Sequence, residues 1–285
     1  MIRVEPATPE MFTEIAPLFE GFNNPKITRS QWRSLFEYPW PCADAARGFV
    51  LRDGERCAGF FGTVWSEREI GGRRERLCNL TSWITLPEYR HHSLLLLKAV
   101  LALEDCTITC HSPAPQLYPI YKKFGFRDLE TKLRIILPWP SLPPRIGMGA
   151  RVFSDPDQIA PRLGESEGAI LAAHRVPGCG HLLIETRSGS CYVVFTRTRG
   201  RKRSFSHLHY IGSPAVFVRH LDRVKLHLLA LNRTPLMMID ARLVAGVEIP
   251  HSREVPLGVA HVFRSPTLAP GQIDNLYSEL ILLGL

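Results

Sequence analysis

The sequence lacks the features that define several common classes of protein. It has no uninterrupted run of eighteen apolar residues, so we expect no membrane-spanning helix. None of its seven cysteines forms a Cys-x-x-Cys pair, which argues against a structural zinc site. The cysteines are odd in number and stand within apolar segments. We therefore expect buried, reduced thiols rather than a disulfide framework.

The first residues, MIRVE, also lack the apolar core of a secretory signal peptide, and we expect the protein to stay in the cytoplasm. Hydrophobic residues make up 45% of the sequence and charged residues 22%, which is ordinary for a globular protein. A length of 285 residues is comfortable for two domains, each with its own core.

Positive charge is in excess. The 35 Lys and Arg residues outnumber 27 Asp and Glu, which gives a net charge of +8. This surplus favours anionic partners, such as a phosphate-bearing small molecule, nucleic acid or a membrane surface, without selecting among them.

The first part of the chain has the pattern of helices followed by an antiparallel meander. Thr8 followed by Pro9 predicts the start of a helix that ends near Gly21. The pairs Asp53-Gly54 and Gly71-Gly72 predict two hairpins between runs of alternating apolar residues.

The stretch 84–126 organises the rest of this half. It reads as a strand, a tight turn at ITLPEYRHHSLL, an apolar helix to Leu103, a strand at 107–110, a short helix and a further strand. A turn that leads into a helix leaves backbone N–H groups unpaired and adds the positive end of the helix dipole. The turn is therefore a candidate anion site.

Two motifs in this stretch carry a family resemblance. Residues 86–90 (LPEYR) before a helix, and 121–126 (YKKFGF) some thirty residues later, resemble the acetyl-CoA-binding core of the Gcn5-related N-acetyltransferases, or GNAT superfamily. The resemblance implies an α/β fold with a mixed, mostly antiparallel central sheet flanked by helices. Ser93 and Leu95 stand where this family places two small residues beside the CoA pyrophosphate, so they depart from its pattern.

The resemblance also implies a site. The pantetheine arm of acetyl-CoA, or of another acyl-CoA, would pair with backbone near 84–86, and the amides after Arg90 would hold the pyrophosphate. The expected cofactor-binding residues are Ile84, Thr85, Leu86, Arg90, His91, His92, Ser93, Leu94 and Leu95. In the same family the loop between the first two helices lies over the acceptor, which makes Phe22, Asn23 and Asn24 candidates for substrate contact.

Tyr121 is the residue that the resemblance marks as catalytic, because the family places a Tyr where its hydroxyl can protonate the departing CoA thiolate. The alternative is a Tyr that only packs the short helix, and Tyr118 is the weaker competitor. The candidates for a general base are Asn79, Ser82 and His111, and the sequence does not choose among them.

A proline-rich segment divides the chain. Residues 137–144 (LPWPSLPP) predict a stiff linker, so we expect an N-terminal acyltransferase domain at 1–140, a linker at 141–150 and a second domain at 151–285. In the second half, strands near 181–211, a helix from Ser213-Pro214 and a strand at 235–240 repeat the order of the first half. We interpret the second domain as a diverged copy of the same GNAT-like module.

Two further motifs have open interpretations. The run from Arg197 to Arg203 (RTRGRKR) is either a solvated hairpin tip or a clamp for phosphates or nucleic acid. His207 and His209 would share one face of a strand, but no third ligand is placed by the sequence, and we expect no metal.

The leading hypothesis is an acyl-CoA-dependent N-acyltransferase that transfers an acetyl group to an amine of a small molecule or peptide. The first alternative is a non-catalytic GNAT-like scaffold in which Ser93 and Leu95 have closed the cofactor groove. Binding of nucleic acid through residues 197–203 is the least favoured.

Overall fold

A computed structural model describes residues 1–42, 46–141, 144, 149–200 and 203–285. The chain forms two compact units. Unit 1 comprises residues 1–127, 261–269 and 277–283, and unit 2 comprises 128–260, 270–276 and 284–285. Most of the expected linker at 141–150 lies outside the described residues.

Unit 1 is built on a mixed sheet. Among its described residues, β4 and β5 pair in parallel and the other strand pairs are antiparallel. Its strands, in spatial order, are β1 (Ile2–Pro6), β2 (Gly48–Asp53), β3 (Arg56–Ile70), β4 (Arg73–Thr85), β5 (Thr107–Cys110) and residues 261–264 of β12 (Ser252–Arg264). Its helical segments are η1 (Pro9–Met11), α1 (Phe12–Ile15), η2 (Ala16–Phe22), α2 (Arg29–Ser34), η3 (Pro87–His92), α3 (Ser93–Leu101), α4 (Tyr118–Lys123) and α9 (Glu279–Leu283).

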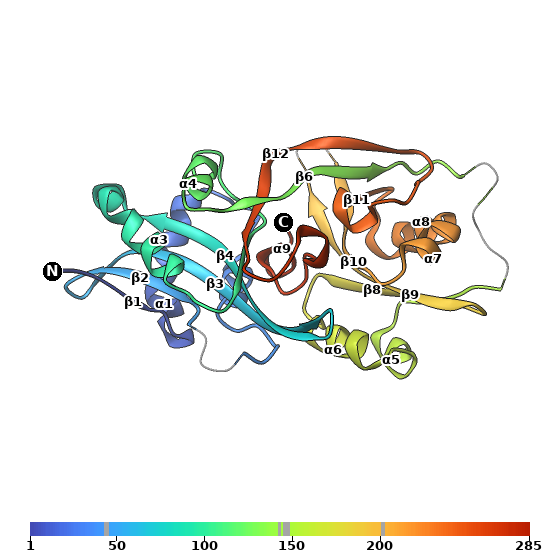
Figure 1. Ribbon diagram of the computed structural model, residues 1–285, viewed down its shortest axis with the longest axis horizontal. Coiled ribbons are helices and arrows are strands. Elements are labelled where there is room, and N and C mark those ends of the chain that lie inside the picture. The colour runs from blue at the N-terminus through green and yellow to red at the C-terminus, as the bar shows by residue number, and fades with distance from the viewer. Residues whose placement is uncertain (43–45, 142–143, 145–148, 201–202) are drawn as a thin grey trace. The chain divides into compact units, whose positions relative to one another are not determined.

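The two faces of this sheet are covered by different helices because side chains alternate along each strand. Phe60 contacts Phe19 and Phe36 of the α1–α2 segment. Its neighbour Phe61 packs in the other core with Leu96 and Leu97 of α3, and α3 lies against β1, β2 and β3 (Figure 1). The antiparallel pairing of β2 with β3 and of β3 with β4 confirms the expected hairpins and meander.

Unit 2 repeats this plan. Its strands, in order, are β7 (Arg151–Phe153), β8 (Cys179–Thr186), β9 (Gly189–Arg199), β10 (Ser204–Ile211), β11 (Leu236–Asp240), β6 (Arg127–Ile136, in unit 2 from residue 128) and residues 252–260 of β12. The fourth and fifth, β10 and β11, again pair in parallel. Its helical segments are α5 (Pro156–Ile159), η4 (Ala160–Arg162), α6 (Glu165–Ala173), α7 (Pro214–Arg219), α8 (Leu221–Asn232), η5 (Ala241–Val244) and η6 (Pro270–Gln272).

The domain boundaries inferred from the prolines differ from these units. Strand β6, which ends before the prolines, pairs with β11 of unit 2, and the end of β12 pairs with β5 of unit 1. Each sheet is thus completed by a strand that follows the other module in sequence. A strand's alternating pattern shows which of its faces is buried but not which sheet it joins, so composition alone could not locate this exchange.

Several helices are shorter than their patterns indicate. The first helix is divided among η1, α1 and η2, where Pro17 stands at the start of η2. The helix after Ser213 breaks at His220 into α7 and α8. Helix α3 is also less buried than expected, because Leu94 and Leu95 are exposed. All seven cysteines are free thiols, and no helix among the described residues is long and apolar enough to cross a bilayer.

Candidate functional site

The fourth and fifth strands of unit 1 separate. Their parallel pairing runs from Leu77↔Thr107 to Asn79↔Thr109, whereas β4 continues along β3 to Thr85. The β3–β4 register shifts between Phe60 and Gly62, and Ser82, on the opposite strand, has φ of 55°. This is the geometry of a β-bulge, which bends a strand away from its neighbour. The last residues of β4 therefore present an edge that β5 does not cover.

A cleft of about 680 Å³ lies along this edge. Its lining residues come from the end of β4, the turn into α3, the segment before α4, and η2: Trp83, Ile84, Thr85, Leu86, Pro87, Arg90, Ser93, Ala114, Gln116, Leu117, Ile120, Pro17, Leu18, Gly21 and Phe22. The structure thus brings together five of the nine residues that the sequence nominated for the cofactor. An apolar cleft with an exposed backbone edge and one arginine suits an extended amide-containing chain that carries a phosphate.

The expected tight turn into α3 is a 3₁₀ helix. Residues Pro87–His92 form the 3₁₀ helix η3, in which the Tyr89 N–H donates to the Leu86 carbonyl at 2.9 Å. The Ser93 N–H donates to the Arg90 carbonyl. Because no glycine stands between Arg90 and Leu95, the backbone keeps right-handed helical dihedrals through His92 and Ser93. Some of the amides that an anion would use are therefore occupied by the turn itself.

The remaining nominated residues do not line the cleft. His91 is exposed and His92 is half-buried, and their ring centroids are 4.0 Å apart. Leu94 and Leu95 are 51% and 40% exposed. Neither leucine is among the lining residues of the cleft, so the side chain of Leu95 does not fill the cleft.

Tyr121 lies behind the wall of the cleft. Only 1% of its surface is exposed, and its phenol hydrogen-bonds to the thiol of Cys110. Burial raises the pKa of Tyr121 well above its ordinary value. Its ring meets that of Trp83 edge-to-face at 6.1 Å, and Trp83 lines the cleft. The hydroxyl is thus protonated at neutral pH, but it is separated from solvent.

Sequence reasoning missed a buried carboxylate in this unit. Glu279, at the start of α9, is fully buried. The exposed Ser112 donates its hydroxyl to Glu279 Oε1 at 2.8 Å, and the Glu279 N–H donates to Asn79 Oδ1 at 2.9 Å. Burial raises the pKa of Glu279 to about 7. Asn79 is paired with Thr109 where β4 and β5 separate, so Glu279 lies beside the point of separation.

The other candidate bases are placed less favourably for proton transfer. His111 is buried, with its ring 5.4 Å from that of His261. Ser82 shares a hydrogen bond with Thr81 at 3.1 Å. No signal in the sequence near residue 279 could have indicated Glu279, because its partners precede it by about two hundred residues.

A second cavity of about 470 Å³ lies at the α1–α2 segment of unit 1. It is lined by Asn23 and Asn24 together with Glu20 and Trp32, among other residues. Trp32 stacks on Phe22, with ring centroids 5.5 Å apart, and Phe22 lines the first cleft. The residues nominated for acceptor contact therefore border two neighbouring hollows.

In unit 2 the corresponding position is filled. Strand β10 also shifts register, between Leu208 and Tyr210, but the side chain of Glu167 lies against Gly212, where an added Cβ would be 2.2 Å from Glu167 Oε1. Tyr210 donates its hydroxyl to the same oxygen at 3.2 Å. Burial raises the pKa of Glu167.

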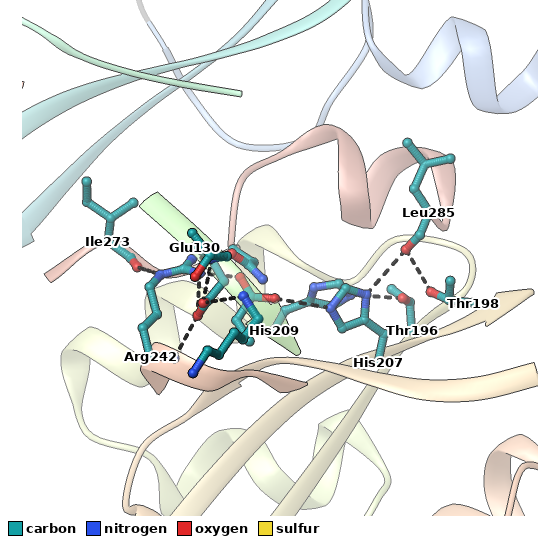
Figure 2. A network of polar contacts seen from close by, with 12 residues as sticks. Glu130, Thr196, Thr198, His207, His209, Arg242, Ile273 and Leu285 are labelled. Atoms are coloured by element: carbon teal, nitrogen blue, oxygen red, sulfur yellow. Dashed lines mark hydrogen bonds and ion pairs between the residues drawn. The ribbon is translucent and has the colours of Figure 1, made fainter. Parts of the chain in front are cut away.

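The His207-x-His209 motif of unit 2 belongs to a polar network (Figure 2). His209 shares a hydrogen bond with Thr196 at 2.9 Å, and His207 Nε2 is 3.8 Å from Asp240 Oδ1. Asp240 pairs with Arg242, whose N–H donates to Glu130 Oε2 at 2.7 Å. Among the described residues no group of three or more His, Cys, Asp or Glu is arranged to hold a metal ion.

Comparison with known proteins bears on the fold. No family model matches the sequence, and no relative is found among curated proteins. Solved structures do match. A conserved Enterococcus faecalis protein of unknown function, named a probable N-acyltransferase, has a TM-score of 0.61 at 13% identity, over 93% of this chain and 72% of that one.

Two proteins named GCN5-related N-acetyltransferases match over the same 93% of this chain. The protein from Kribbella flavida has a TM-score of 0.57 at 14% identity and is covered over 71% of its length. The protein from Anabaena variabilis has a TM-score of 0.55 at 14% identity and is covered over 72%. The chain has the fold of the Gcn5-related N-acetyltransferases. The two units share one strand order from their first to their fifth strands, and the expected α/β class with two GNAT-like modules is confirmed.

Proposed function

We propose that the protein is an acyl-CoA-dependent N-acyltransferase whose active site is the cleft of unit 1. The observation that carries this proposal is the separation of β4 and β5 within a GNAT fold, with a cleft of about 680 Å³ along the uncovered edge. The backbone at Ile84 and Thr85, at the uncovered end of β4, would pair with the pantetheine arm and polarise the thioester carbonyl, whereas the Leu86 N–H is already donated to the Ala58 carbonyl at 2.9 Å. Arg90 would bind the pyrophosphate.

The chain's own groups supply the two proton transfers of acyl transfer. The acceptor nitrogen forms a bond to the carbonyl carbon, the carbon–sulfur bond breaks, and the electron pair leaves on sulfur. We assign Tyr121 as the donor to the thiolate; because Tyr121 is buried and does not line the cleft, the neighbouring Trp83 would have to move for its hydroxyl to reach the sulfur. We assign Glu279 as the group that takes the amine proton, through Ser112, because Ser112 is exposed and lies two residues before the cleft-lining Ala114.

The acceptor would be an amine of a small molecule or a peptide. Glu20 and the ring of Trp32 line the cavity beside the cleft, together with the cationic Arg29, and a carboxylate and an aromatic face each attract a cationic amine. Holding the amine beside the thioester makes the attack effectively intramolecular, which removes the entropic cost of an encounter in solution.

Calorimetric titration with acetyl-CoA tests the proposal. We expect saturable binding that Arg90→Gln weakens roughly tenfold, as for loss of one charge-assisted hydrogen bond. Arg219→Gln, which removes an exposed arginine from α7 of unit 2, should leave the affinity unchanged. A thermal-shift panel of acyl-CoAs of increasing chain length would then identify the acyl group.

A second candidate is a GNAT-like scaffold without catalysis. The occupied amides of η3 favour it, because they reduce the number of donors available to a pyrophosphate. Absence of heat with acetyl-CoA at millimolar concentration, together with absence of any shift in melting temperature across the panel, would establish this candidate in place of the enzyme.

A further inference from the structure

Unit 2 contains a cavity of about 500 Å³ that the proposed reaction does not use. It lies where β6 has ended and where β10 and β11 begin. Its lining residues are Leu137, Pro138, Trp139, Arg197, Arg203, Ser204, Arg233, Pro235 and Leu236. The walls are thus the ends of neighbouring strands and the residue after α8, which are positions that the sheet holds in place.

The charge of this cavity is of one sign. Three of the nine lining residues are arginines and none is acidic. Arg197 is on β9, Arg203 immediately precedes β10, and Arg233 ends α8 with its N–H bonded to the Leu229 carbonyl at 3.0 Å. Guanidinium groups held around one hollow repel each other unless an anion lies among them. Planar guanidinium groups with several donors match phosphate oxygens.

Other residues that line the cavity are apolar, and one of them is aromatic. Trp139 is 60% exposed and lines the cavity with Pro138 and Pro235. Lys225 donates to the Trp139 carbonyl at 2.6 Å, which fixes the backbone that carries the ring. An indole face left in water is a surface on which a planar base can stack.

We propose that this cavity binds a nucleoside phosphate, with the base on Trp139 and the phosphate among Arg197, Arg203 and Arg233. A volume near 500 Å³ is within the range for a small ligand. One aromatic ring in one hollow favours a single nucleotide over a nucleic-acid strand, which is bound by successive stacking rings along a groove. Two sources share this chemistry: a free nucleotide, and the nucleotide end of CoA.

Calorimetry of the full-length protein with ADP tests the proposal. The expected result is saturable binding that Arg197→Gln/Arg233→Gln weakens by roughly tenfold or more and that added salt also weakens. Trp139→Ala should lower the affinity for ADP while leaving that for inorganic phosphate unchanged. Arg187→Gln, an exposed arginine of the same unit outside the cavity, is the matched control and should have no effect.

The unit 1 cleft is distinguished by Arg90→Gln, because ADP that binds there through its pyrophosphate is lost in this variant, whereas ADP bound in the unit 2 cavity remains and is lost only with Arg197→Gln/Arg233→Gln. If CoA affinity falls with Trp139→Ala as ADP affinity does, the nucleotide end of CoA is the source; if it does not, the ligand is a free nucleotide. Absence of saturable ADP binding at millimolar concentration, or binding insensitive to the double variant, overturns the proposal. Tighter binding of a single-stranded oligonucleotide than of ADP, lost in the double variant, overturns it in favour of nucleic acid.

Discussion

The two units share a strand plan but differ in what lies beside the end of the fourth strand. Each has four antiparallel strands, a shift of register on the fourth and a parallel fifth strand. In unit 1 the edge beyond Asn79 borders a cleft of about 680 Å³. In unit 2 the pairing of β10 with β11 ends at Leu208, and Glu167 occupies the space beside Gly212.

The difference shows that a shared fold determines where a binding site can form but does not by itself create one. A bulge on the fourth strand is common to both units, whereas the side chains that come after it decide whether a ligand has room. The segments after the two fifth strands also differ. Unit 1 continues to α4, which carries Tyr121, and unit 2 continues to the 3₁₀ helix η5.

The largest expected effect concerns the stability of unit 2. Arg242 pairs with the fully buried Asp240 and donates to Asn275 Oδ1 at 2.5 Å and to the Ile273 carbonyl at 3.1 Å. Arg242→Ala leaves a buried carboxylate without its cation and should cost about 3 to 5 kcal/mol of unfolding free energy. Urea denaturation followed by circular dichroism measures this.

The control for Arg242 is Arg74→Ala in unit 1. Arg74 pairs with Glu67 on the surface, where its side chain is 82% exposed, so the unfolding free energy should hardly change. Equal changes in unfolding free energy for Arg242→Ala and Arg74→Ala would show that the pairing of Arg242 with Asp240 does not stabilise unit 2.

The second effect is a pH dependence specific to unit 1. The pKa of Glu279 is about 7 in the folded chain against an ordinary 4.5, so the folded state holds its proton where the unfolded state has lost it. Stability should therefore fall as pH rises from about 4.5 to 7. At 1.36 kcal/mol per pKa unit the change is of order 3 kcal/mol.

Unfolding free energies of Glu279→Gln, measured from acid to neutral pH, should lack this decline. Parallel curves for the variant and the parent protein would contradict the assignment of the raised pKa. In an active preparation of the parent protein, kcat/KM should rise with pH around the Glu279 pKa of about 7. This rise should be absent in Glu279→Gln.

Tyr121→Phe tests the catalytic asymmetry between the units. Loss of a proton donor should lower kcat by roughly a hundredfold or more, while loss of its hydrogen bond to Cys110 should reduce stability by only about 1 kcal/mol. The rate of acyl transfer to an amine, monitored through the CoA thiol that the reaction releases, gives kcat. Tyr118→Phe is the control, and a similar kcat for both variants would reduce Tyr121 to a packing residue.

The smallest effect concerns the filled groove of unit 2. Gly212→Ala would displace the Glu167 carboxylate from its hydrogen bond with Tyr210, at a cost of about 1 kcal/mol. Acetyl-CoA affinity should not change. A change in that affinity would mean that unit 2, and not only unit 1, takes part in binding the cofactor.

The local patterns of the sequence determined much of the architecture. Alternating apolar residues with Asp53-Gly54 and Gly71-Gly72 specify the meander, and Tyr121 with Gly125 specifies a short helix ended by a left-handed glycine. These features arise from hydrogen bonds and sterics within a few residues, so a linear reading can find them. The family resemblance nominated six residues that line the cleft of unit 1, five for the cofactor and Phe22 for the acceptor.

Only the tertiary structure decided the rest. That β6 completes unit 2 and β12 completes unit 1 depends on which sheet edge each strand meets. That Glu279 stands beside Asn79 with a pKa near 7 depends on contacts between residues two hundred positions apart. Burial and charge at such a position are sums over neighbours from many segments, and these neighbours are not defined until the chain has folded.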